Sequence, residues 1–160
     1  MSTTVPDLYL PTKNTGNFDT VKADATGPVP FVLWERITKS GVTAAAGAAS
    51  YALTHKLPAR AIVQYYSIKS LSADLDMDTG THVGLGWSTD LDAFTEVLEA
   101  DLESNEEDYG IPDVAQTPLS AATSVQVAST TAGGVAAGTM DNFDLYIVIW
   151  GVILPGIKDA

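Results

Sequence analysis

The fold of this chain is decided by the stretch LYIVIWGVIL at residues 145–154, which is followed by Pro155 and Gly156. Its ten residues are about half of the roughly 20 that a membrane-spanning helix needs. Its β-branched and aromatic side chains favour a strand, in which side chains alternate between two faces. One face would carry Leu145, Ile147, Ile149 and Ile153, and the other Tyr146, Val148, Trp150, Val152 and Leu154.

Both faces of this predicted strand are apolar, so both need to be covered. One face can pack against an opposite sheet, while the other needs a helix, an N-terminal arm or another subunit. We therefore predict that this second face contacts a partner through four side chains: Tyr146, Val148, Trp150 and Val152.

Four more stretches have the composition and punctuation of strands, namely residues 31–38, 61–69, 82–88 and 124–129. Strict alternation in residues 61–69 would place Ala61, Val63, Tyr65 and Ser67 opposite Ile62, Gln64, Tyr66 and Ile68. In residues 82–88 the two glycines, Gly84 and Gly86, share one face, where a neighbouring element could approach closely.

A helix is predicted from Thr89 to about Ser104. Thr89 followed by Asp92 matches a capping box. At 3.6 residues per turn, the apolar side chains at 91, 94, 98 and 102 fall on one face and the acidic side chains at 92, 96, 99 and 103 on the other. We expect this helix to lie in a loop between strands.

Strands separated by Gly, Pro and Thr, with one helix in a loop, predict a mainly β protein: an antiparallel β-sandwich of jelly-roll type. The length of 160 residues fits one domain with a core of its own. We place this domain at residues 29–160.

Residues 1–28 are predicted to form an extended N-terminal arm, because Pro, Gly, Thr, Asn and Asp interrupt any helical or strand period. Leu8, Tyr9 and Leu10 are apolar, so we expect the arm to pack on its own domain or on a neighbour, disorder being the alternative. These three residues join the predicted partner contact.

Charge divides the chain into two halves. Residues 1–69 carry seven Lys/Arg against four Asp/Glu, and residues 70–160 carry one against sixteen, for a formal net charge of −12. Thirteen carboxylates fall between Asp74 and Asp113, here called the acidic segment. Such a block repels nucleic-acid phosphates and anionic lipids, so we expect no nucleic-acid partner and no membrane. We expect the acidic half to face solvent and the other half to face the partner.

The chain has no cysteine, which excludes disulfides, zinc–thiolate sites, iron–sulfur clusters and thiol nucleophiles. The N-terminus has neither the basic start nor the apolar run of a secretory signal. We therefore expect a soluble protein that is not exported by that route.

Two metal sites are worth weighing. Asp74, Asp76 and Asp78 have the spacing that opens a calcium loop, but Thr79 and Leu85 stand where an EF-hand needs Gly and Glu. A solvated acidic turn is the favoured interpretation, with an irregular calcium site as the alternative. His55 and His82 would have to converge with an acid to bind a metal, which lone histidines beside strands seldom do. We expect no cofactor and no metal.

No catalytic motif stands out. The chain has no Gly-x-Ser-x-Gly elbow, and neither Gly84-x-Gly86 nor Gly133-Gly134 belongs to a phosphate-binding loop. We therefore expect no catalytic residues and no enzyme. Trp34, Trp87 and Trp150 could line a sugar platform, but each lies within a strand-like stretch, where packing in the core is favoured. Carbohydrate binding by a host-attachment domain remains the alternative.

Residues 58–154 resemble small β-sandwich virion structural proteins of tailed bacteriophages, of the capsid decoration, fibre or tail type. The likeness lies in four stretches: LPARAIV at 57–63 leading into a strand, GLGW at 84–87 followed by TDLDAF at 89–94, a middle rich in Ser, Thr, Ala and Gly, and DLYIVIW at 144–150.

This resemblance implies a structural component of a capsid or tail, without catalytic residues to carry over. The two-faced strand and the arm independently suit a subunit that assembles. We expect a homo-oligomer, with a trimer as the first choice, that decorates or cements the outside of a capsid and contacts the major capsid protein or other virion proteins. A fibre or tail role is the alternative.

Overall fold

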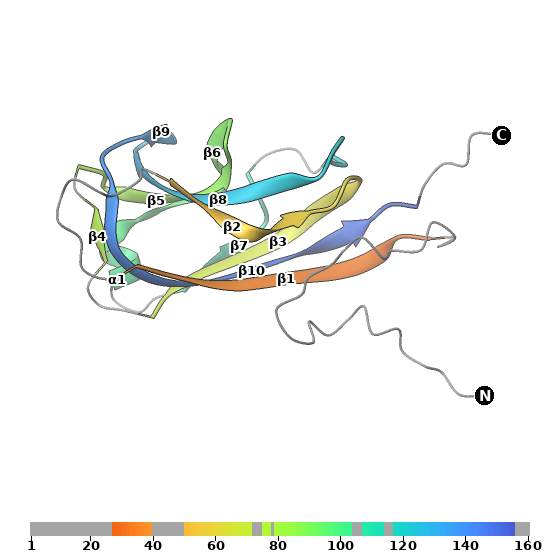
Figure 1. Cartoon of the computed structure of the whole chain (residues 1–160), viewed down its shortest axis with the longest axis horizontal. Helices are drawn as coiled ribbons and strands as arrows, with labels where there is room; N and C mark the ends of the chain where they lie inside the picture. Colours follow the sequence, from red (N-terminus) through yellow and green to blue (C-terminus); the bar gives the residue numbers. More distant parts are fainter. Residues whose placement is uncertain are drawn as a thin grey trace.

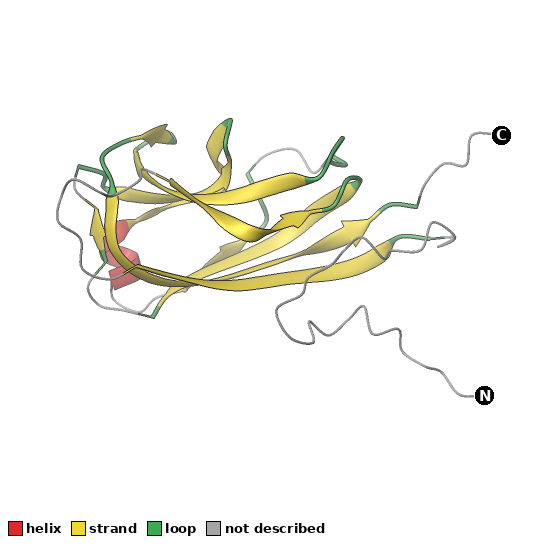
Figure 2. Ribbon diagram, in the orientation of Figure 1, coloured by secondary structure: helices red, strands yellow, loops and turns green. Residues whose placement is uncertain are grey.

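The computed structural model describes residues 27–39, 50–71, 75–77, 79–103, 107–113 and 117–155. Residues 1–26 of the predicted arm, including Leu8, Tyr9 and Leu10, lie outside the described residues. The described chain is mainly β, with a single short helix at one end of two facing sheets (Figures 1 and 2). The elements are β1 (Val29–Lys39), β2 (Ser50–Leu57), β3 (Ala61–Ser70), β4 (Asp76–Met77), β5 (His82–Trp87), β6 (Asp90–Leu98), α1 (Glu99–Glu103), β7 (Glu107–Gly110), β8 (Thr123–Thr131), β9 (Val135–Ala136) and β10 (Met140–Ile153).

Eight of these strands form two antiparallel four-stranded sheets, in the orders β1-β10-β3-β7 and β2-β8-β5-β6. The short strands β4 and β9 add to β10 and β8. The chain passes repeatedly from one sheet to the other, and its first and last long strands lie side by side. This is the strand order of a jelly roll, so the predicted fold class is confirmed.

The two sheets face each other (Figure 1), and the core lies between them, where the inner side chains of both sheets meet. Along β10, buried side chains alternate with exposed or half-buried ones, and along β1 buried or half-buried side chains alternate with exposed ones. Leu145, Ile147 and Ile149 of β10 are fully buried, and Ile153 nearly so, as the alternation predicted. Phe31 and Leu33 of β1 complete this side of the core.

The predicted strands at 31–38, 61–69, 82–88 and 124–129 correspond to β1, β3, β5 and β8. The alternation predicted for β3, however, is wrong beyond Val63. The pairing of β10 with β3 shifts register between Trp150 and Gly151, so that β3 gains a residue at this point. After this bulge Tyr66 faces the core and Tyr65 faces outward, with exposed fractions of 6% and 49%.

The predicted helix from Thr89 to Ser104 is also wrong over most of its length. Residues 90–98 form strand β6, and only Glu99–Glu103 is helical. Thr89 lies in the turn between β5 and β6 instead of capping a helix. Pairing with β5 overrides the local helical pattern, because each paired residue gains a ladder bond and a packed neighbour. Phe94 and Leu102 are buried as predicted, while Leu98 is exposed.

The glycines of β5 allow β6 to fold over it. The register between the two strands jumps from Leu85 opposite Thr95 to Trp87 opposite Asp90, so four residues of β6 bulge opposite Gly86. A Cβ on Gly84 would lie 2.6 Å from the Leu91 carbonyl oxygen, and one on Gly86 would meet backbone atoms of Asp90, Leu91 and Ala93. The predicted close approach at these two glycines is confirmed.

We predict that Gly86→Ala lowers the free energy of unfolding by about 2–3 kcal/mol, because the methyl group has only backbone around it and β6 has to move. Gly27→Ala is the matched control, since nothing lies within 4 Å of its Cβ position. Urea unfolding of the two variants measures the difference. Equal stabilities would contradict the close approach of β6.

Polar side chains close the sandwich along both of its sides. On the β1–β2 side, β2 bulges between Ala52 and Lys56. The Glu35 carboxylate accepts hydrogen bonds from the backbone N–H groups of Thr54 and His55 at 2.7 and 3.3 Å. The bulge leaves these two N–H groups without a partner in the β2–β8 ladder, and a carboxylate from the opposite sheet accepts their hydrogen bonds instead.

The other side is closed between β6 and β7, with β3 behind them. The Thr95 hydroxyl donates to Asp108 Oδ2 at 3.0 Å. The Tyr66 ring packs here as well, and burial raises the pKa of its hydroxyl to about 12.

Glu96 anchors the turn between β8 and β9. Its carboxylate accepts hydrogen bonds from the Gly133 and Gly134 N–H groups, both at 2.8 Å, and from the Thr130 hydroxyl at 2.9 Å. Both glycines have positive φ, 88° and 70°, which suits a tight turn. Partial burial raises the pKa of the Glu96 carboxyl, but these hydrogen bonds outweigh it, so the pKa lies below its ordinary value.

We predict that Glu96→Gln lowers the free energy of unfolding at pH 7 by about 1 kcal/mol, because the amide accepts fewer hydrogen bonds than the carboxylate. A carboxyl whose pKa is depressed by folding stabilises the fold above its unfolded pKa and loses that effect as pH falls through its folded pKa. The loss of stability of the parent chain below about pH 5 should therefore be smaller in Glu96→Gln. Unfolding is measured from pH 7 to pH 3 for the parent chain, Glu96→Gln and the control Asp101→Asn, whose side chain is exposed on α1. Identical pH profiles for all three chains would contradict the anchoring role of Glu96.

Candidate assembly surface

The outer face of the β1-β10-β3-β7 sheet presents a surface ordered in rows by the strand registers. One row joins Pro30, Val152 and Ile62 across β1, β10 and β3, the next joins Val32, Trp150 and Tyr65, and the third joins Trp34, Val148 and Ser67 and continues to Tyr109 on β7. We call these three rows the apolar half of the face.

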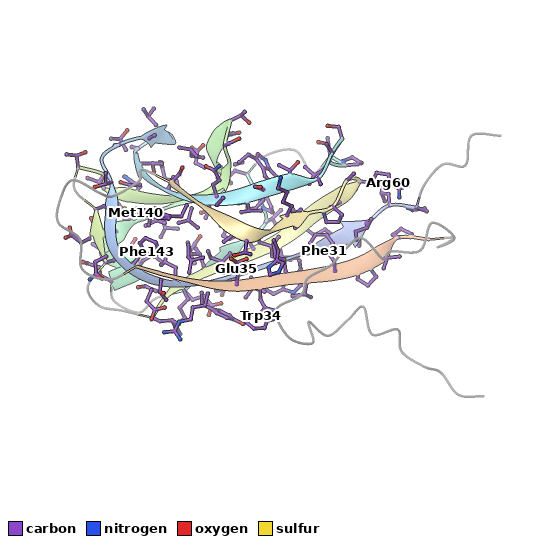
Figure 3. The ribbon with its side chains drawn as sticks, viewed as in Figure 1. Phe31, Trp34, Glu35, Arg60, Met140 and Phe143 are labelled. Carbon is purple, nitrogen blue, oxygen red and sulfur yellow. The ribbon has the colours of Figure 1, made fainter. Side chains whose placement is uncertain are left out.

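Large apolar side chains in this half are exposed. The exposed fractions are 37% for Trp34, 40% for Val32 and Trp150, and 49% for Tyr65. Figure 3 shows Trp34 projecting from β1 away from the sandwich, whereas Phe31 and Glu35 of the same strand lie between the sheets. Large apolar side chains exposed on three neighbouring strands make this face the candidate contact surface.

Ring pairs stiffen this surface across neighbouring strands. Trp34 on β1 and Tyr146 on β10 have ring centroids 6.0 Å apart, and Tyr65 on β3 and Trp150 on β10 have centroids 6.3 Å apart. Gly151 makes the second pair possible, because a Cβ there would collide with the Ile62 carbonyl group at the bulge that turns Tyr65 outward. The four rings therefore lie beside one another in pairs on this face, across neighbouring strands.

A charged half adjoins the apolar half along the same strands. The fourth row joins Arg36, Tyr146, Lys69 and Glu107. Arg36 binds Asp144 with two hydrogen bonds, Nε to Oδ1 at 2.8 Å and Nη2 to Oδ2 at 2.6 Å. The hydrogen bonds from the guanidinium lower the pKa of the Asp144 carboxyl below its usual range. The outer face therefore changes from apolar to charged along the strand direction.

Most of the described carboxylates of the acidic segment lie away from β1 and β2. They belong to β6, α1, β7 and the residues that follow β7, and β6 and β7 are the strands farthest from β1 and β2 in the two sheets. Asp76 lies on β4, which pairs with β10, and Glu107 belongs to the fourth row of the outer face. Burial raises the pKa of the Glu99 carboxyl, and nearby Glu103 and Asp76 raise it further. The hydrogen bond that the Asp90 carboxyl donates to Asp92, followed by burial, raises the pKa of Asp90. Carboxylates that already repel one another would be costly to desolvate further, so this side suits solvent and the apolar half suits a contact.

The predicted contact residues on the last strand do share one surface. Tyr146, Val148, Trp150 and Val152 all lie on the outer face of β10, at least partly exposed. Their role in a partner contact stays a prediction. Sequence reasoning missed that Val32, Trp34 and Tyr65 belong to the same surface. The alternation of residues 31–38 carried that signal for β1, whereas the bulge that turns Tyr65 outward left none.

The tryptophans do not all pack as predicted. Trp34 and Trp150 lie on the outer face, so placing them in the core was wrong. Trp87 is half-buried and packs edge-to-face on Phe94, with centroids 4.6 Å apart, which agrees with the prediction.

The structure does not bring the candidate metal ligands together among the described residues. Asp74 and Asp78 lie outside the described residues, and Asp76 is exposed. His55 contacts Glu35 at 3.3 Å, whereas His82 contacts the Thr81 hydroxyl on the other side of β8. In the described ranges there is no group of three or more His, Asp or Glu side chains placed to hold a metal ion. No helix among the described residues is long and apolar enough to cross a membrane.

Two solved capsid structures contain a chain with a similar fold. The first is the capsid asymmetric unit of cyanophage Pam1, with a TM-score of 0.56 and 16% identity over 81% of this chain and 88% of that chain. The second is the acidic stable capsid of Helicobacter pylori bacteriophage KHP30, with a TM-score of 0.51 and 13% identity over 80% of this chain and 90% of that chain. No protein-family model and no curated protein matches the sequence. The resemblance to virion structural proteins is thus confirmed in the fold.

We predict that acrylamide quenches the fluorescence of Trp34 and Trp150 in dilute protein and quenches it less at tens of micromolar, where self-association would cover both rings. The double variant Trp34→Phe/Trp150→Phe retains only Trp87 and should show no dependence on concentration. Quenching that stays strong at every concentration, or rings that are shielded even at high dilution, would contradict an open contact surface.

Proposed function

We propose that this protein is a non-enzymatic structural protein of a phage virion, and that it decorates or cements the outside of a capsid as a homo-oligomer. A trimer is the expected oligomer. The observation that carries the proposal is the apolar half of the outer face, exposed on a jelly roll whose fold is similar to chains of two phage capsids. A sandwich of this kind gives a stiff platform on which such a face can be presented.

The described interior supports a structural role. The buried residues are mainly apolar, and six of them carry hydroxyl groups: Tyr66, Ser67, Ser70, Thr95, Ser129 and Thr130. Ser129 donates to the Ala137 carbonyl oxygen and Thr130 to Glu96, so these two hydroxyls hold the chain where β8 leads into β9. Side chains used in this way stabilise a fold and leave little for acid–base or nucleophilic chemistry.

The distribution of charge supports an orientation on the particle. A contact through the acidic side would force clustered carboxylates out of water, whereas a contact through the outer face of β1, β10 and β3 buries mainly apolar side chains. We therefore place that face against neighbouring copies, the major capsid protein or other virion proteins, and the acidic side toward the medium.

Carbohydrate binding is the second candidate function. The exposed rings favour it, whereas the sequence analysis had favoured packing of the tryptophans in the core. Trp34, Tyr65 and Trp150 lie on one face with their side chains exposed. Flat aromatic surfaces bind the apolar faces of sugar rings, so a fibre or tail domain that attaches to a host glycan would also use such a platform.

Immunogold electron microscopy of purified particles tests the proposal. An antibody raised against this chain should label intact particles from the source culture, spread over the whole capsid surface. Label confined to the tail would replace the decoration role with the fibre or tail alternative. Label absent from particles that sediment intact would overturn the virion assignment.

Glycan-array binding separates the second candidate. Binding of the parent chain to a glycan, lost in Trp34→Thr/Trp150→Thr and retained in Leu98→Thr on the other sheet, would establish the sugar platform. No binding by the parent chain, together with capsid label, leaves decoration as the function.

A further inference from the structure

We propose that the apolar half of the outer face is the docking site for the Leu8–Leu10 segment of a second copy of this chain. Each copy would donate its N-terminal arm to one neighbour and receive an arm from another. This inference rests on the self-association in the proposed function. The two surfaces that would meet are the Leu8–Leu10 segment of one copy and the apolar half of another.

The length of the apolar half suits a short extended segment. Pro30 and Trp34 lie about 13 Å apart along β1, and neighbouring strands lie about 4.8 Å apart. Three residues of an extended chain span about 10 Å. A segment of this length from a neighbouring copy can therefore cover the exposed side chains of these rows.

The position of β1 points to the segment that contributes. β1 is an edge strand of the sheet, and its first residues, Val29 and Pro30, lie at the apolar end of the face. The arm is therefore attached directly beside the surface that needs covering. The 18 residues between Leu10 and Val29 could reach up to about 60 Å if extended, which is ample to cross to a neighbouring copy.

The composition of the arm matches the surface. Leu8, Tyr9 and Leu10 supply two aliphatic side chains and a ring, and Pro6 and Pro11 flank them. Proline cannot donate a backbone hydrogen bond, so a strand that the arm added to a sheet edge would be limited to about residues 7–10. Docking onto the exposed side chains of β1, β10 and β3 buries all three apolar side chains without a longer ladder.

The net charge favours association through an arm over direct packing of one domain against another. Each copy carries a formal net charge of −12, which opposes close approach of whole domains. An arm lets the acidic sides stay apart while apolar groups meet. Arm and face are different surfaces, so the contact is heterologous and closes into a ring where the rotation allows, as a trimer requires.

Complementation between two full-length variants tests this arrangement. One variant loses the arm anchors, Leu8→Ser/Tyr9→Ser/Leu10→Ser, and the other loses the face, Trp34→Thr/Trp150→Thr, with threonine chosen to keep strand propensity. Controls are Asn14→Ser/Thr15→Ser in the arm and Leu98→Thr, an exposed apolar residue on the other sheet. Circular dichroism confirms that each variant folds, and sedimentation with native mass spectrometry reports assembly.

We expect the parent chain and both controls to form a closed oligomer at tens of micromolar, and each test variant alone to associate at least about tenfold more weakly. Mixed in equal amounts, the two test variants should form a one-to-one dimer and nothing larger, because only one intact arm and one intact face remain. Continued assembly of the arm variant alone would indicate face-to-face packing, and a mixture that stays monomeric would indicate that each arm serves its own domain. A parent chain that stays monomeric would also overturn the inference. Capsid labelling is independent of these results, so the virion role and the arm exchange can fail separately.

Discussion

The structure depends on β10, the central strand that is hydrogen-bonded to β1 on one side and to β3 on the other. β10 pairs with β1 through eleven consecutive residue pairs, without a shift in register. Its alternation therefore divides the chain into a core and an outer surface, because a slip by one residue would exchange Ile147 and Ile149 for Tyr146 and Val148. The same geometry that buries one row of apolar side chains exposes the other. The apolar half of the outer face is thus a consequence of the same alternation in β10 that stabilises the core. Its exposed side chains are available for a contact.

Edge strands and bulges are where this sandwich departs from regularity, and each bulge is accommodated either by a side chain or by a glycine. The bulge in β2 leaves two backbone N–H groups without a ladder partner, and the Glu35 carboxylate accepts their hydrogen bonds from across the sandwich. The bulge in β6 needs the two glycines of β5. The bulge between β10 and β3 needs Gly151 and turns Tyr65 outward to meet Trp150. In this last case an irregularity of the backbone builds part of the candidate surface, as β-bulges often re-aim a side chain.

Comparison of the helix prediction with β6 shows where local pattern reasoning fails. Residues 89–103 carry a capping box and a helical apolar face, and in isolation those signals are sound. Thr95 and Val97 are also good strand residues, and the partner strand β5 offers glycines on the face that β6 crosses. Ladder pairing and burial of Phe94 outweigh propensities worth a few tenths of a kcal/mol per residue. Only the last part, Glu99–Glu103, where pairing ends, follows its helical preference.

The sequence by itself determined five of the strands, β1, β3, β5, β8 and β10, together with the two faces of β10, the close approach at Gly84 and Gly86, and the clustering of acid in one half of the chain; strands β2 and β7 went unpredicted. These properties depend on residue type and on the two-residue repeat of a strand, which neighbours cannot alter. Only the tertiary structure decided that β6 is a strand, that Tyr65 faces outward, and that Trp34, Tyr65 and Trp150 share one surface. Strand order, register shifts and bulges arise from pairing between segments far apart in sequence, and no local pattern specifies those pairings.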